Sequence, residues 1–560
     1  MTDEVPSLDT YHLHEQQWES YEHILETFEW QIPDQFNIAD YVCDRWATDQ
    51  HRVALYADSA TGDARKFTYA DLQKYTDQLA AYLRQHGVDR GTRIGVNLPQ
   101  KPEAAIAHIA AWKVGAISVP LSTLFGPEGL EYRLKDSDAD VCIVDQSNIE
   151  AFRAARPAST TATLIVGEVE HRDVEVDFWE AITGSPSEFD AVRTEPEDDA
   201  IIMYTSGTTG LPKGVLHGHQ VLLGHLPAFV VTNSDLKIGL EEVYWSPSEW
   251  AWIATLFDLL FPALFFGKSA LVYYSTEFDP RKAFSLLDDY EVTKYLAPPT
   301  ALRKMMQVDS PATTFNVESV DTIVSGGEAV GSEIDRWIRD VFDDTALNEN
   351  YGQTEANAVI GECTALESTR EGTMGRQLPG HEVRVLDPET LTEVNPGTVG
   401  EIALRYETDP VCFKKYWKNR QKTAEKIQDV WLLTGDLGTC DKDGYFTFHS
   451  RKDDVIISAG YRIGPEEIEE TLTTHSAVAE AGVIGIPDDE RSEVPKAFVV
   501  LTPDRSPTES LKENLQRYVK DRLAKYEYPR EIEVLDELPM TVTGKVQRSK
   551  LKQRETDDKK

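Results

Sequence analysis

Short apolar runs alternate with segments of helical periodicity between about residues 52 and 324, and this alternation constrains the fold more than any other feature. Residues 71–86 illustrate the helical type, because Thr68 and Asp71 can form a capping box before them and Gly87 can end the helix. Alternation of this kind predicts α/β layers with mainly parallel sheets. The predicted strands are residues 94–97, 116–119, 141–144, 163–166, 201–204, 271–274 and 320–324.

The pattern changes after Gly372, where short strands at 383–386, 399–404 and 445–449 are separated by Gly, Pro and Asp turns. These strands predict a β-rich subdomain. A charged segment follows at 451–454, and beyond it an α+β pattern runs to the end of the chain. We therefore expect a large N-terminal domain over 1–450, a hinge at 451–453 and a small C-terminal α+β domain over 454–560.

Acidic residues outnumber basic ones by 96 to 56 in the 560-residue chain, which leaves a net charge of −40. This charge disfavours nucleic acid and anionic membranes as partners. The acidic residues are spread along the chain, which is typical of proteins from a halophilic cytosol, where salt screens self-repulsion. An acidic mesophilic enzyme is the alternative.

The compartment can be predicted from cysteines and apolar segments. The five cysteines form no C-x-x-C pair, and the acidic N-terminus does not resemble a secretory signal. The most apolar stretch, 253–266, contains Asp258 and Pro262 and is too short to span a bilayer. We therefore expect a soluble cytoplasmic protein without a membrane span.

The most informative segment, YTSGTTGLPKG at 204–214, follows a predicted strand. Small residues allow backbone N–H groups to approach an anion, hydroxyls add donors and Lys213 adds charge, so the segment suits a triphosphate. It is not a G-x-x-x-x-G-K-[ST] loop, because Pro212 and Gly214 replace the second glycine and the Ser/Thr. A nucleotide-binding loop of another kind is predicted.

This loop resembles the phosphate-binding loop of the superfamily of acyl-CoA synthetases, peptide-synthetase adenylation domains and beetle luciferases. Further segments resemble that superfamily's motifs in the same order, at 325–329, 350–355, 434–436, 451–469 and 543–545. Segments 351–355 and 460–465 are most similar to those of medium-chain acyl-CoA synthetases. The resemblance implies a layered α/β adenylation domain followed by a mobile C-terminal domain.

The resemblance also implies a reaction. A carboxylate attacks the α-phosphate of ATP to give acyl-AMP and pyrophosphate, and coenzyme A then takes the acyl group and releases AMP. The attacking carboxylate is already ionised near pH 7, so the first step needs no general base. The protein must instead position the reactants and neutralise charge at phosphorus.

The resemblance assigns roles to individual residues. Lys545 would bridge the acyl carboxylate and the α-phosphate, Thr354 and Lys213 would contact phosphates, and Glu355 would bind Mg²⁺. Rotation of the C-terminal domain about Asp453 would present a different face of that domain to the active site in each of the two steps. The expected ATP- and CoA-binding set is Thr205, Ser206, Gly207, Thr208, Thr209, Gly210, Lys213, Gly327, Glu328, Ala329, Asn350, Tyr351, Gly352, Gln353, Thr354, Asp436, Arg451, Ala459, Gly460, Tyr461, Arg462, Arg491 and Arg530.

Gly352 and Trp250 are the expected acyl-site residues. Acetate-specific relatives carry Trp where this chain has Gly352, so short- to medium-chain acids are favoured over acetate alone. Pro247 and Glu249 depart from the pattern around Trp250, and core packing is an equal alternative for that tryptophan. An acetate–CoA ligase, an adenylating enzyme that loads a carrier protein and a catalytically inactive nucleotide-binding paralogue remain alternative functions. The pairs His12/His14 and His217/His219 are not expected to bind metal.

Overall fold

A computed structural model describes residues 6–59, 64–168, 174–205, 211–327, 330–343, 345–458, 461–488, 491–503, 505–523, 528–541 and 545–557. The chain divides into two compact units. The larger comprises Met1–Thr205, Pro212–Glu382 and Arg405–Trp431, and the smaller comprises Ser206–Leu211, Val383–Leu404 and Leu432–Lys560. The β-rich segment thus groups with the C-terminal residues, and the division expected at 451–453 stays a prediction.

The first sheet of the larger unit has eight strands in the order β19-β9-β8-β4-β3-β5-β6-β7. Its neighbours from β8 to β7 pair in parallel, and the hairpin of β8 with β9 is antiparallel. The predicted parallel sheet is therefore confirmed. The strands are β3 (Arg93–Asn97), β4 (Ile117–Pro120), β5 (Val141–Asp145), β6 (Ala162–Val166), β7 (Glu175–Asp177), β8 (Asp199–Thr205), β9 (Lys213–Gly218) and β19 (Lys415–Tyr416).

The second sheet of the larger unit has nine strands in the order β16-β15-β14-β13-β12-β10-β11-β1-β2. Its central strands are parallel, and antiparallel strands close both edges. The strands are β1 (Val53–Ser59), β2 (Arg65–Thr68), β10 (Val243–Trp245), β11 (Ser269–Tyr274), β12 (Lys294–Leu296), β13 (Thr322–Gly326), β14 (Ala346–Gln353), β15 (Asn357–Gly361) and β16 (Arg376–Gln377).

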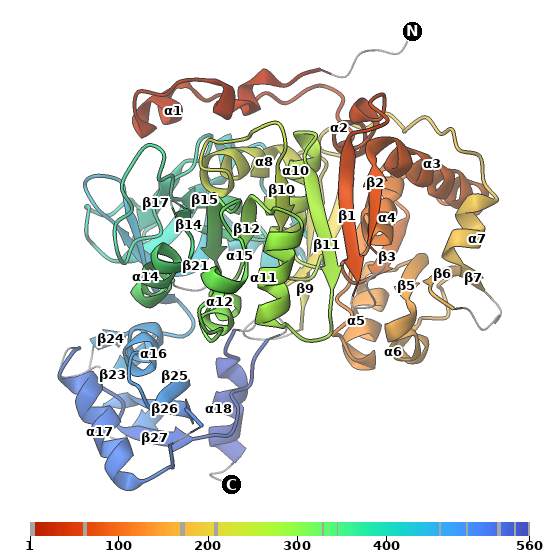
Figure 1. Cartoon of the computed structure of the whole chain (residues 1–560). Coiled ribbons are helices and arrows are strands. Elements are labelled where there is room, and N and C mark those ends of the chain that lie inside the picture. Colours follow the sequence, from red (N-terminus) through yellow and green to blue (C-terminus); the bar gives the residue numbers. More distant parts are fainter. Residues whose placement is uncertain are drawn as a thin grey trace. The chain divides into compact units, whose positions relative to one another are not determined.

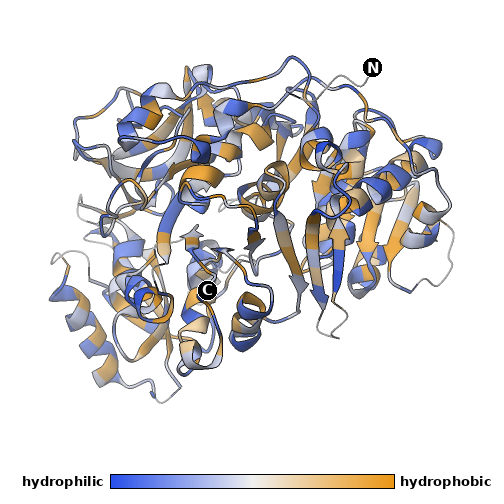
Figure 2. Cartoon of the chain, turned by 45° about the horizontal axis from the view of Figure 1, so that its top comes forward, coloured by the Kyte–Doolittle hydropathy of each residue, from blue (hydrophilic) through white to orange (hydrophobic). Residues whose placement is uncertain are grey.

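Helices of the larger unit cover both sheets, and α4 (Pro102–Lys113) and α8 (Val221–Ala228) are buried along their whole length. Trp112 of α4 donates to the Ala200 carbonyl in β8 and lies 4.7 Å from the Phe261 ring, which ties the first sheet to the second sheet's helices. Apolar residues accordingly concentrate on strands and inner helices in Figure 2. The remaining helical segments are α2 (Ile38–Val42), α3 (Tyr69–Gln85), α5 (Pro127–Ser137), α6 (Ile149–Ala155), α7 (Phe178–Thr183), η5 (Phe229–Asn233), α9 (Ile253–Thr255), η6 (Leu256–Leu260), α10 (Phe261–Phe265), α11 (Pro280–Asp289), α12 (Pro299–Met305), α13 (Pro311–Thr314), α14 (Ser332–Val341) and α15 (Arg420–Lys426).

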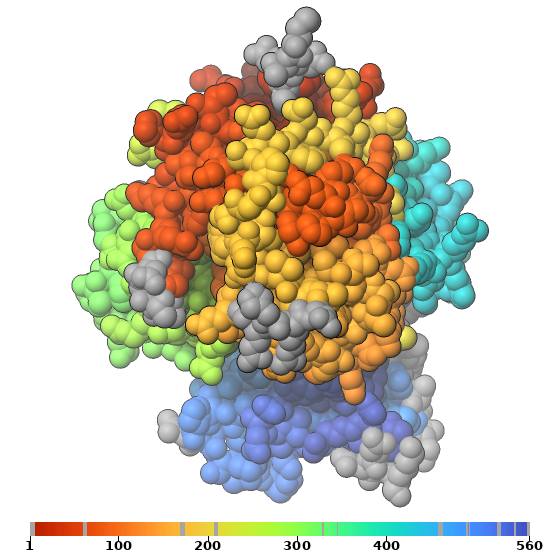
Figure 3. All heavy atoms as spheres, turned by 90° about the vertical axis from the view of Figure 1, so that its right-hand side faces the viewer, coloured from red at the N-terminus to blue at the C-terminus, as the bar shows by residue number. Residues whose placement is uncertain are grey.

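Helix α3 confirms the sequence prediction at its N-terminus. The Thr68 hydroxyl accepts from the Asp71 amide at 3.1 Å, and the Asp71 carboxylate accepts from the Thr68 amide at 3.0 Å. This reciprocal pair satisfies two amide donors that a helix N-terminus otherwise leaves without partners. Figure 3 shows the corresponding side of the larger unit as a continuous surface in orange and yellow.

The N-terminal segment packs on the rest of the larger unit and includes helix α1 (Tyr21–Thr27; Figure 1). The Trp30 indole donates to the Gly380 carbonyl at 2.8 Å, and the Tyr21 hydroxyl donates to the Gln377 carbonyl at 3.2 Å. Arg376 pairs with Glu22 at 2.8 Å. Residues at least 350 positions apart are thus joined by direct polar contacts.

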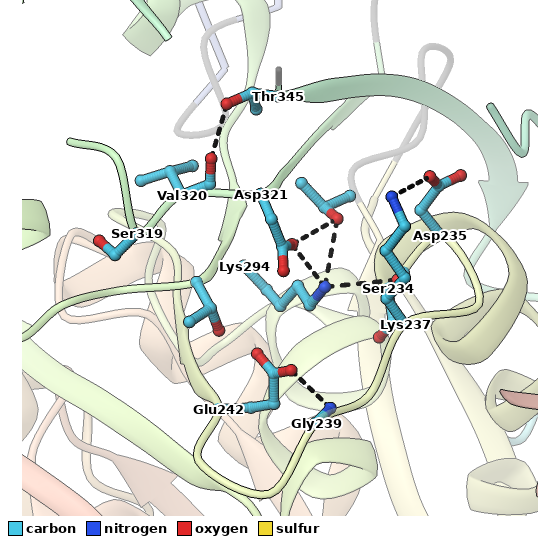
Figure 4. A network of polar contacts seen from close by, with 12 residues as sticks. Ser234, Asp235, Lys237, Gly239, Glu242, Lys294, Ser319, Val320, Asp321 and Thr345 are labelled. Atoms are coloured by element: carbon cyan, nitrogen blue, oxygen red, sulfur yellow. Dashed lines mark hydrogen bonds and ion pairs between the residues drawn. The ribbon is translucent and has the colours of Figure 1, made fainter. Parts of the chain in front are cut away.

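An ionic network around the buried Lys294 lies at the N-terminal ends of β10, β12 and β13 (Figure 4). The Lys294 ammonium is 2.5 Å from an Asp321 carboxylate oxygen, and it also donates to the Thr322 hydroxyl at 3.3 Å and the Ser234 carbonyl at 3.4 Å. Lys294 is only 2% exposed, so these partners compensate for its desolvation. Ligands of parallel α/β sheets bind at the opposite, carboxyl ends of the strands, so this network is structural.

The smaller unit contains two further sheets. In one, β18 lies between β17 and β21, and β22 also pairs with β21. In the other, the order is β24-β23-β26-β25, with β27 on β26. The elements are β17 (Val383–Leu386), β18 (Gly400–Arg405), β21 (Trp431–Cys440), β22 (Phe446–Arg451), β23 (Ile456–Ser458), β24 (Tyr461–Ile463), α16 (Pro465–Thr473), β25 (Val478–Asp488), β26 (Ser492–Leu501), α17 (Glu509–Lys520), β27 (Glu531–Val534) and α18 (Arg548–Asp557). The predicted β-rich segment is therefore confirmed. Across the described part of the chain, no helix combines the length and apolar character needed to cross a bilayer.

Candidate active site

The predicted phosphate loop joins two antiparallel strands. Thr205, at the end of β8, pairs in register with Lys213, at the start of β9. Lys213 therefore has its position fixed by a strand, whereas the lysine of a P-loop lies at the start of a helix. The predicted contacts Ser206, Gly207, Thr208, Thr209 and Gly210 lie outside the described residues.

The end of β14 carries Asn350, Tyr351, Gly352 and Gln353, and Thr354 and Glu355 follow in the turn to β15. Gly326 of β13 is paired with Asn350, and a Cβ at Gly326 would lie 2.2 Å from the Asn350 side-chain oxygen. The lack of a side chain at Gly326 thus makes room for Asn350. Gly327, with φ of +83°, turns the chain directly after β13. Glu328 and Ala329 lie outside the described residues.

Glu355 is the centre of a charged cluster in the larger unit. The Tyr416 hydroxyl donates to its carboxylate at 2.5 Å, and the Lys213 ammonium lies 4.7 Å from the centroid of the Tyr416 ring. Lys426, at the end of α15, donates to the Gln353 side-chain oxygen at 2.7 Å. Two lysines therefore lie around one buried carboxylate at the carboxyl end of β14.

The pKa of Glu355 shows the balance of charge in this cluster. Burial raises it, but the charge of Lys426, the hydrogen bond from Tyr416 and the charge of Lys213 together outweigh burial and hold the pKa below its ordinary value. The carboxylate is thus ionised at neutral pH. An ionised carboxylate is a hard oxygen ligand that suits Mg²⁺, while the two ammonium groups suit the oxygens of a phosphate chain.

His217 connects the strand that carries Lys213 to the turn that carries Glu355. Its Nε2 lies 2.7 Å from the Thr354 carbonyl oxygen, and burial lowers the pKa of the ring to about 4. The neutral ring therefore carries its proton on Nε2 and donates a hydrogen bond to that carbonyl. This contact positions Thr354.

Gly352 requires a correction of the acyl-site argument. A Cβ at this position would lie 2.2 Å from the Asn357 carbonyl oxygen and 2.7 Å from the Ala358 Cα, both in the backbone of β15. The register between β14 and β15 shifts at the neighbouring pair, Tyr351 and Gly352. The lack of a side chain at Gly352 is thus needed for strand pairing, so empty space for an acyl chain is not its only explanation.

Trp250 is 2% exposed and lies in a loop at the carboxyl end of β10. Glu249 accepts from the Thr123 hydroxyl at 2.6 Å and from the Thr123 amide at 3.2 Å, and it also accepts from the Ser122 hydroxyl. Gln100 donates to the Ser246 carbonyl at 2.8 Å. The departure from the family pattern at Glu249 therefore fixes this loop against the ends of β3 and β4.

The smaller unit brings Asp436 and Arg451 together. They are paired in register on β21 and β22, and an Arg451 Nη1 donates to an Asp436 oxygen at 2.8 Å. Glu401 accepts from the Gly435 amide at 3.0 Å and from the Lys452 ammonium at 2.7 Å, which fixes the turn before Asp436. Gly435 has φ of +78°, a conformation that favours glycine.

The remaining predicted residues of the smaller unit are only partly described. Arg530 stacks over Tyr528 at 4.1 Å, the Arg491 amide donates to Asp488 at 2.8 Å, and Asp453 lies 3.6 Å from Arg451 Nε. Lys545 is exposed, and its amide donates to the Thr541 hydroxyl at 3.0 Å. Ala459, Gly460 and the side chains of Tyr461 and Arg462 lie outside what is described.

Among the described residues, ligand atoms of His12, His14 and Glu15 come within 4.8 Å of one another. His12 Nδ1 is 3.2 Å from a Glu15 oxygen, so the two already satisfy each other. Burial lowers the pKa of His14 to about 4, and the charges of His12 and Lys268 lower it further, while Glu15 raises it. A lysine close enough to act on His14 disfavours a bound cation, so this cluster is not assigned as a metal site.

Sequence reasoning missed Tyr416 and Lys426. They lie 61 and 71 residues after Glu355, and no local pattern marks either of them. The only signal near them is the polar helix-start Asn419, whose side chain accepts from the Lys422 amide. Only the packing of β19 and α15 beside β9 and β14 brings them to Glu355.

The fold and the site define an adenylate-forming acyl-CoA ligase. The hairpin of β8 and β9 presents Lys213, the turn after β14 presents Glu355, and α15 presents Lys426. Family comparison agrees. The AMP-binding enzyme model matches residues 43–417, and the AMP-binding enzyme C-terminal domain model matches residues 467–545. The chain belongs to the AMP-binding enzyme family.

Individual relatives cover nearly the whole chain. The mitochondrial acyl-coenzyme A synthetase ACSM3 of Mus musculus is 32% identical over 554 residues, covering 96% of this chain and 94% of its own length. The acyl-CoA ligase YtcI of Bacillus subtilis is 32% identical over 525 residues, covering 93% and 97%. The solved structure of the anthranilate CoA ligase AuaEII with anthranoyl-AMP superposes with a TM-score of 0.85 at 27% identity, covering 94% of this chain and 98% of its own.

Proposed function

We propose that this ligase activates short- to medium-chain carboxylic acids, with Mg²⁺·ATP as the nucleotide substrate, and transfers them to coenzyme A. The observation that carries the proposal is the cluster of Lys213, Lys426 and ionised Glu355 at the carboxyl end of β14. Its two ammonium groups match a polyphosphate, and its carboxylate matches a hard cation. When bound, Mg²⁺ would neutralise phosphate charge, and Glu355 would hold it.

The other residues have roles consistent with this chemistry. Thr354, held by His217 through its carbonyl, would donate its hydroxyl to the α-phosphate. Tyr351 would lie against the adenine. The Asp436 carboxylate, oriented by Arg451, would accept hydrogen bonds from both ribose hydroxyls. Lys545 would neutralise charge between the acyl carboxylate and the α-phosphate, and rotation about Asp453 would then present Gly460 and Tyr461 to coenzyme A.

Strand pairing is a second explanation for Gly352, so the acyl specificity needs its own test. Two structural relatives carry the names of aromatic-acid ligases, for anthranilate and benzoate. The substrate panel should therefore contain straight-chain acids from acetate to decanoate together with benzoate and anthranilate. A preference for a C3–C8 straight-chain acid would support the proposal, and a preference for acetate or an aromatic acid would contradict it.

The central test is a comparison of half-reactions. Acid-dependent exchange between ATP and labelled pyrophosphate reports adenylation, and consumption of free CoA thiol reports transfer. Absence of exchange at both low and high KCl would exclude an adenylating enzyme, and exchange without thiol consumption would favour carrier loading.

Lys545→Ala provides the sharpest variant of this test. We expect it to lower exchange at least 100-fold, because the charge that bridges the reacting anions is lost. Thioester formation from supplied acyl-AMP should stay within about threefold of the wild type. Equal loss of both half-reactions would contradict the assigned role.

We also propose a cytoplasmic location, a role in fatty acid metabolism and an origin in a halophile. Cys43, Cys142, Cys363 and Cys412 are buried free thiols, which fits a reducing compartment. The net charge of −40 fits concentrated salt.

A further inference from the structure

Arg548 is the first residue of α18, three positions after Lys545, and it contacts three carboxylates within the smaller unit. Its Nη1 lies 2.9 Å from both Asp454 and Glu466, and its Nη2 lies 2.6 Å from Glu469. Its Nε donates to the second Glu469 oxygen at 3.1 Å, which makes that pair bidentate. The side chain is only 13% exposed, so the contacts form in a largely desolvated place.

The three carboxylates come from two elements that matter for domain movement. Asp454 directly follows the proposed hinge residue Asp453, and its amide donates to the Arg451 carbonyl at 3.1 Å. Glu466 and Glu469 lie on α16, and Glu469 also accepts from the Val483 amide at 2.6 Å. One guanidinium thus joins the chain beside the hinge, helix α16 and the start of α18.

The charge balance makes this arginine hard to replace. Three carboxylates surround one guanidinium, and the Lys552 ammonium is 3.7 Å from Asp454. Burial raises the pKa of Glu466 to about 8, against the opposing effect of Arg548, so the cluster tolerates a proton on that group at neutral pH. Lysine could supply the charge but not the fork that contacts Glu469 twice.

The rest of α18 is anchored independently of Arg548. Leu551 is 1% exposed and packs with Ile484, Val494 and Phe498. Near the end of the helix, Lys496 lies 2.5 Å from Glu555. Loss of Arg548 would therefore loosen the first turn of α18 and the segment carrying Lys545, while the remainder of the helix stays docked.

We infer that Arg548 is a positioning residue that couples the hinge segment to the Lys545 segment, so that domain rotation delivers Lys545 in a fixed orientation. The inference rests on the proposed function, because it needs Lys545 to act in adenylation. The Arg548 guanidinium is held among three carboxylates, so it would act through Lys545. Its loss should therefore impair adenylation selectively.

The test uses the full-length enzyme with Arg548→Gln and Arg548→Lys. Arg554→Gln is the matched control, because Arg554 lies on the same helix and pairs with Glu533 at 2.9 Å, away from the cluster. We expect acid-dependent ATP–pyrophosphate exchange to fall at least 30-fold in Arg548→Gln and about tenfold in Arg548→Lys. Thioester formation from supplied acyl-AMP should stay within threefold for both, and Arg554→Gln should keep both activities within twofold.

The outcomes separate the two levels of inference. If the wild type shows no acid-dependent exchange, the proposed function fails. If the wild type exchanges but both half-reactions fall equally in Arg548→Gln, at matched folded fraction by circular dichroism, the role is only structural and the inference is overturned. Unchanged exchange would also overturn it. If Arg548→Gln does not fold, the same comparison of exchange with thioester formation is made in Arg548→Lys and decides the outcome.

Discussion

Glu355 is ionised in a position where burial alone would keep it protonated. The lysines that depress its pKa, Lys426 and Lys213, are the groups that a polyphosphate would attract. The carboxylate thus prevents two nearby positive charges from repelling each other before a nucleotide binds. The same group can then accept a cation that arrives with the nucleotide.

Glu355→Gln keeps the shape of the side chain and removes its charge. We expect adenylation to slow about 100-fold and the Mg²⁺ concentration for half-maximal rate to rise, because an amide is a poorer Mg²⁺ ligand. Tyr416→Phe is the control, since it removes only the hydroxyl donor and should change the Mg²⁺ dependence little. Exchange rates measured across a Mg²⁺ titration test this, and an unchanged half-maximal concentration in Glu355→Gln would exclude Glu355 as a ligand.

His108 gives the larger unit a sensitivity to acid. It is fully buried between the Trp112 and Phe261 rings, and burial lowers its pKa to about 3. Between pH 6.5 and that value the unfolded chain binds a proton that the folded protein does not, so stability present above pH 6.5 is lost on acidification. The loss is about 1.4 kcal/mol for each pH unit in this window.

His108→Leu should therefore flatten the dependence of the unfolding temperature on pH between 6.5 and 4.5. Differential scanning calorimetry at several pH values measures this dependence. His23→Gln, at an exposed position, is the control and should leave the slope as it is. A slope in His108→Leu as steep as that of the wild type would contradict the assignment.

At the scale of elements, the hairpin of β14 and β15 depends on Gly352. Gly352→Ala would place a Cβ against the Asn357 carbonyl oxygen, so the strands must separate or shift. We expect a loss of about 2 kcal/mol in stability, seen as a lower unfolding temperature, with reduced adenylation. Gly126→Ala is the control, because nothing lies within 4 Å of its added Cβ. Unchanged stability in Gly352→Ala would show that the strands adjust freely.

Elements with local signals were predictable, and those formed by distant pairing were not. The capping pair at Thr68 and Asp71 marked α3 to within two residues of its observed start, Tyr69. The two short strands β10 and β12 have three residues each and no alternating pattern, so only their neighbours in the sheet define them. The π-helical turn η5 likewise follows Pro227 inside a continuous apolar run.

The same distinction holds for the site. Resemblance to the superfamily's motifs identified Lys213, Glu355, Asp436 and Arg451 as functional candidates, and the composition of the loop at 204–214 also pointed to Lys213. The ion pair between Asp436 and Arg451 depends on strand register, and the contacts of Tyr416 and Lys426 depend on packing. Sequence thus indicated candidate side chains, whereas structure was needed to say what holds them.

At the scale of the whole molecule, the excess acidic side chains, which give a net charge of −40, repel one another in dilute buffer. Salt at about 1 M reduces the screening length to roughly 3 Å, so the repulsion between neighbouring carboxylates falls. We expect both unfolding temperature and exchange activity to rise between 0.1 and about 2 M KCl. Maximal stability and activity in dilute buffer would contradict a halophilic origin, and a potassium glutamate series separates charge screening from effects of chloride.

The pairing of Lys213 with Thr205 separates the fixed charge of the site from the loop that precedes it. An inter-strand ladder, and not the loop, fixes the backbone from which the ammonium group extends. Substitutions among residues 206–210 should therefore alter how the nucleotide is enclosed without moving that charge. Kinetic effects of such substitutions can then be interpreted as changes in loop contacts alone. In a P-loop, where the lysine lies at the start of a helix, the two effects could not be separated in this way.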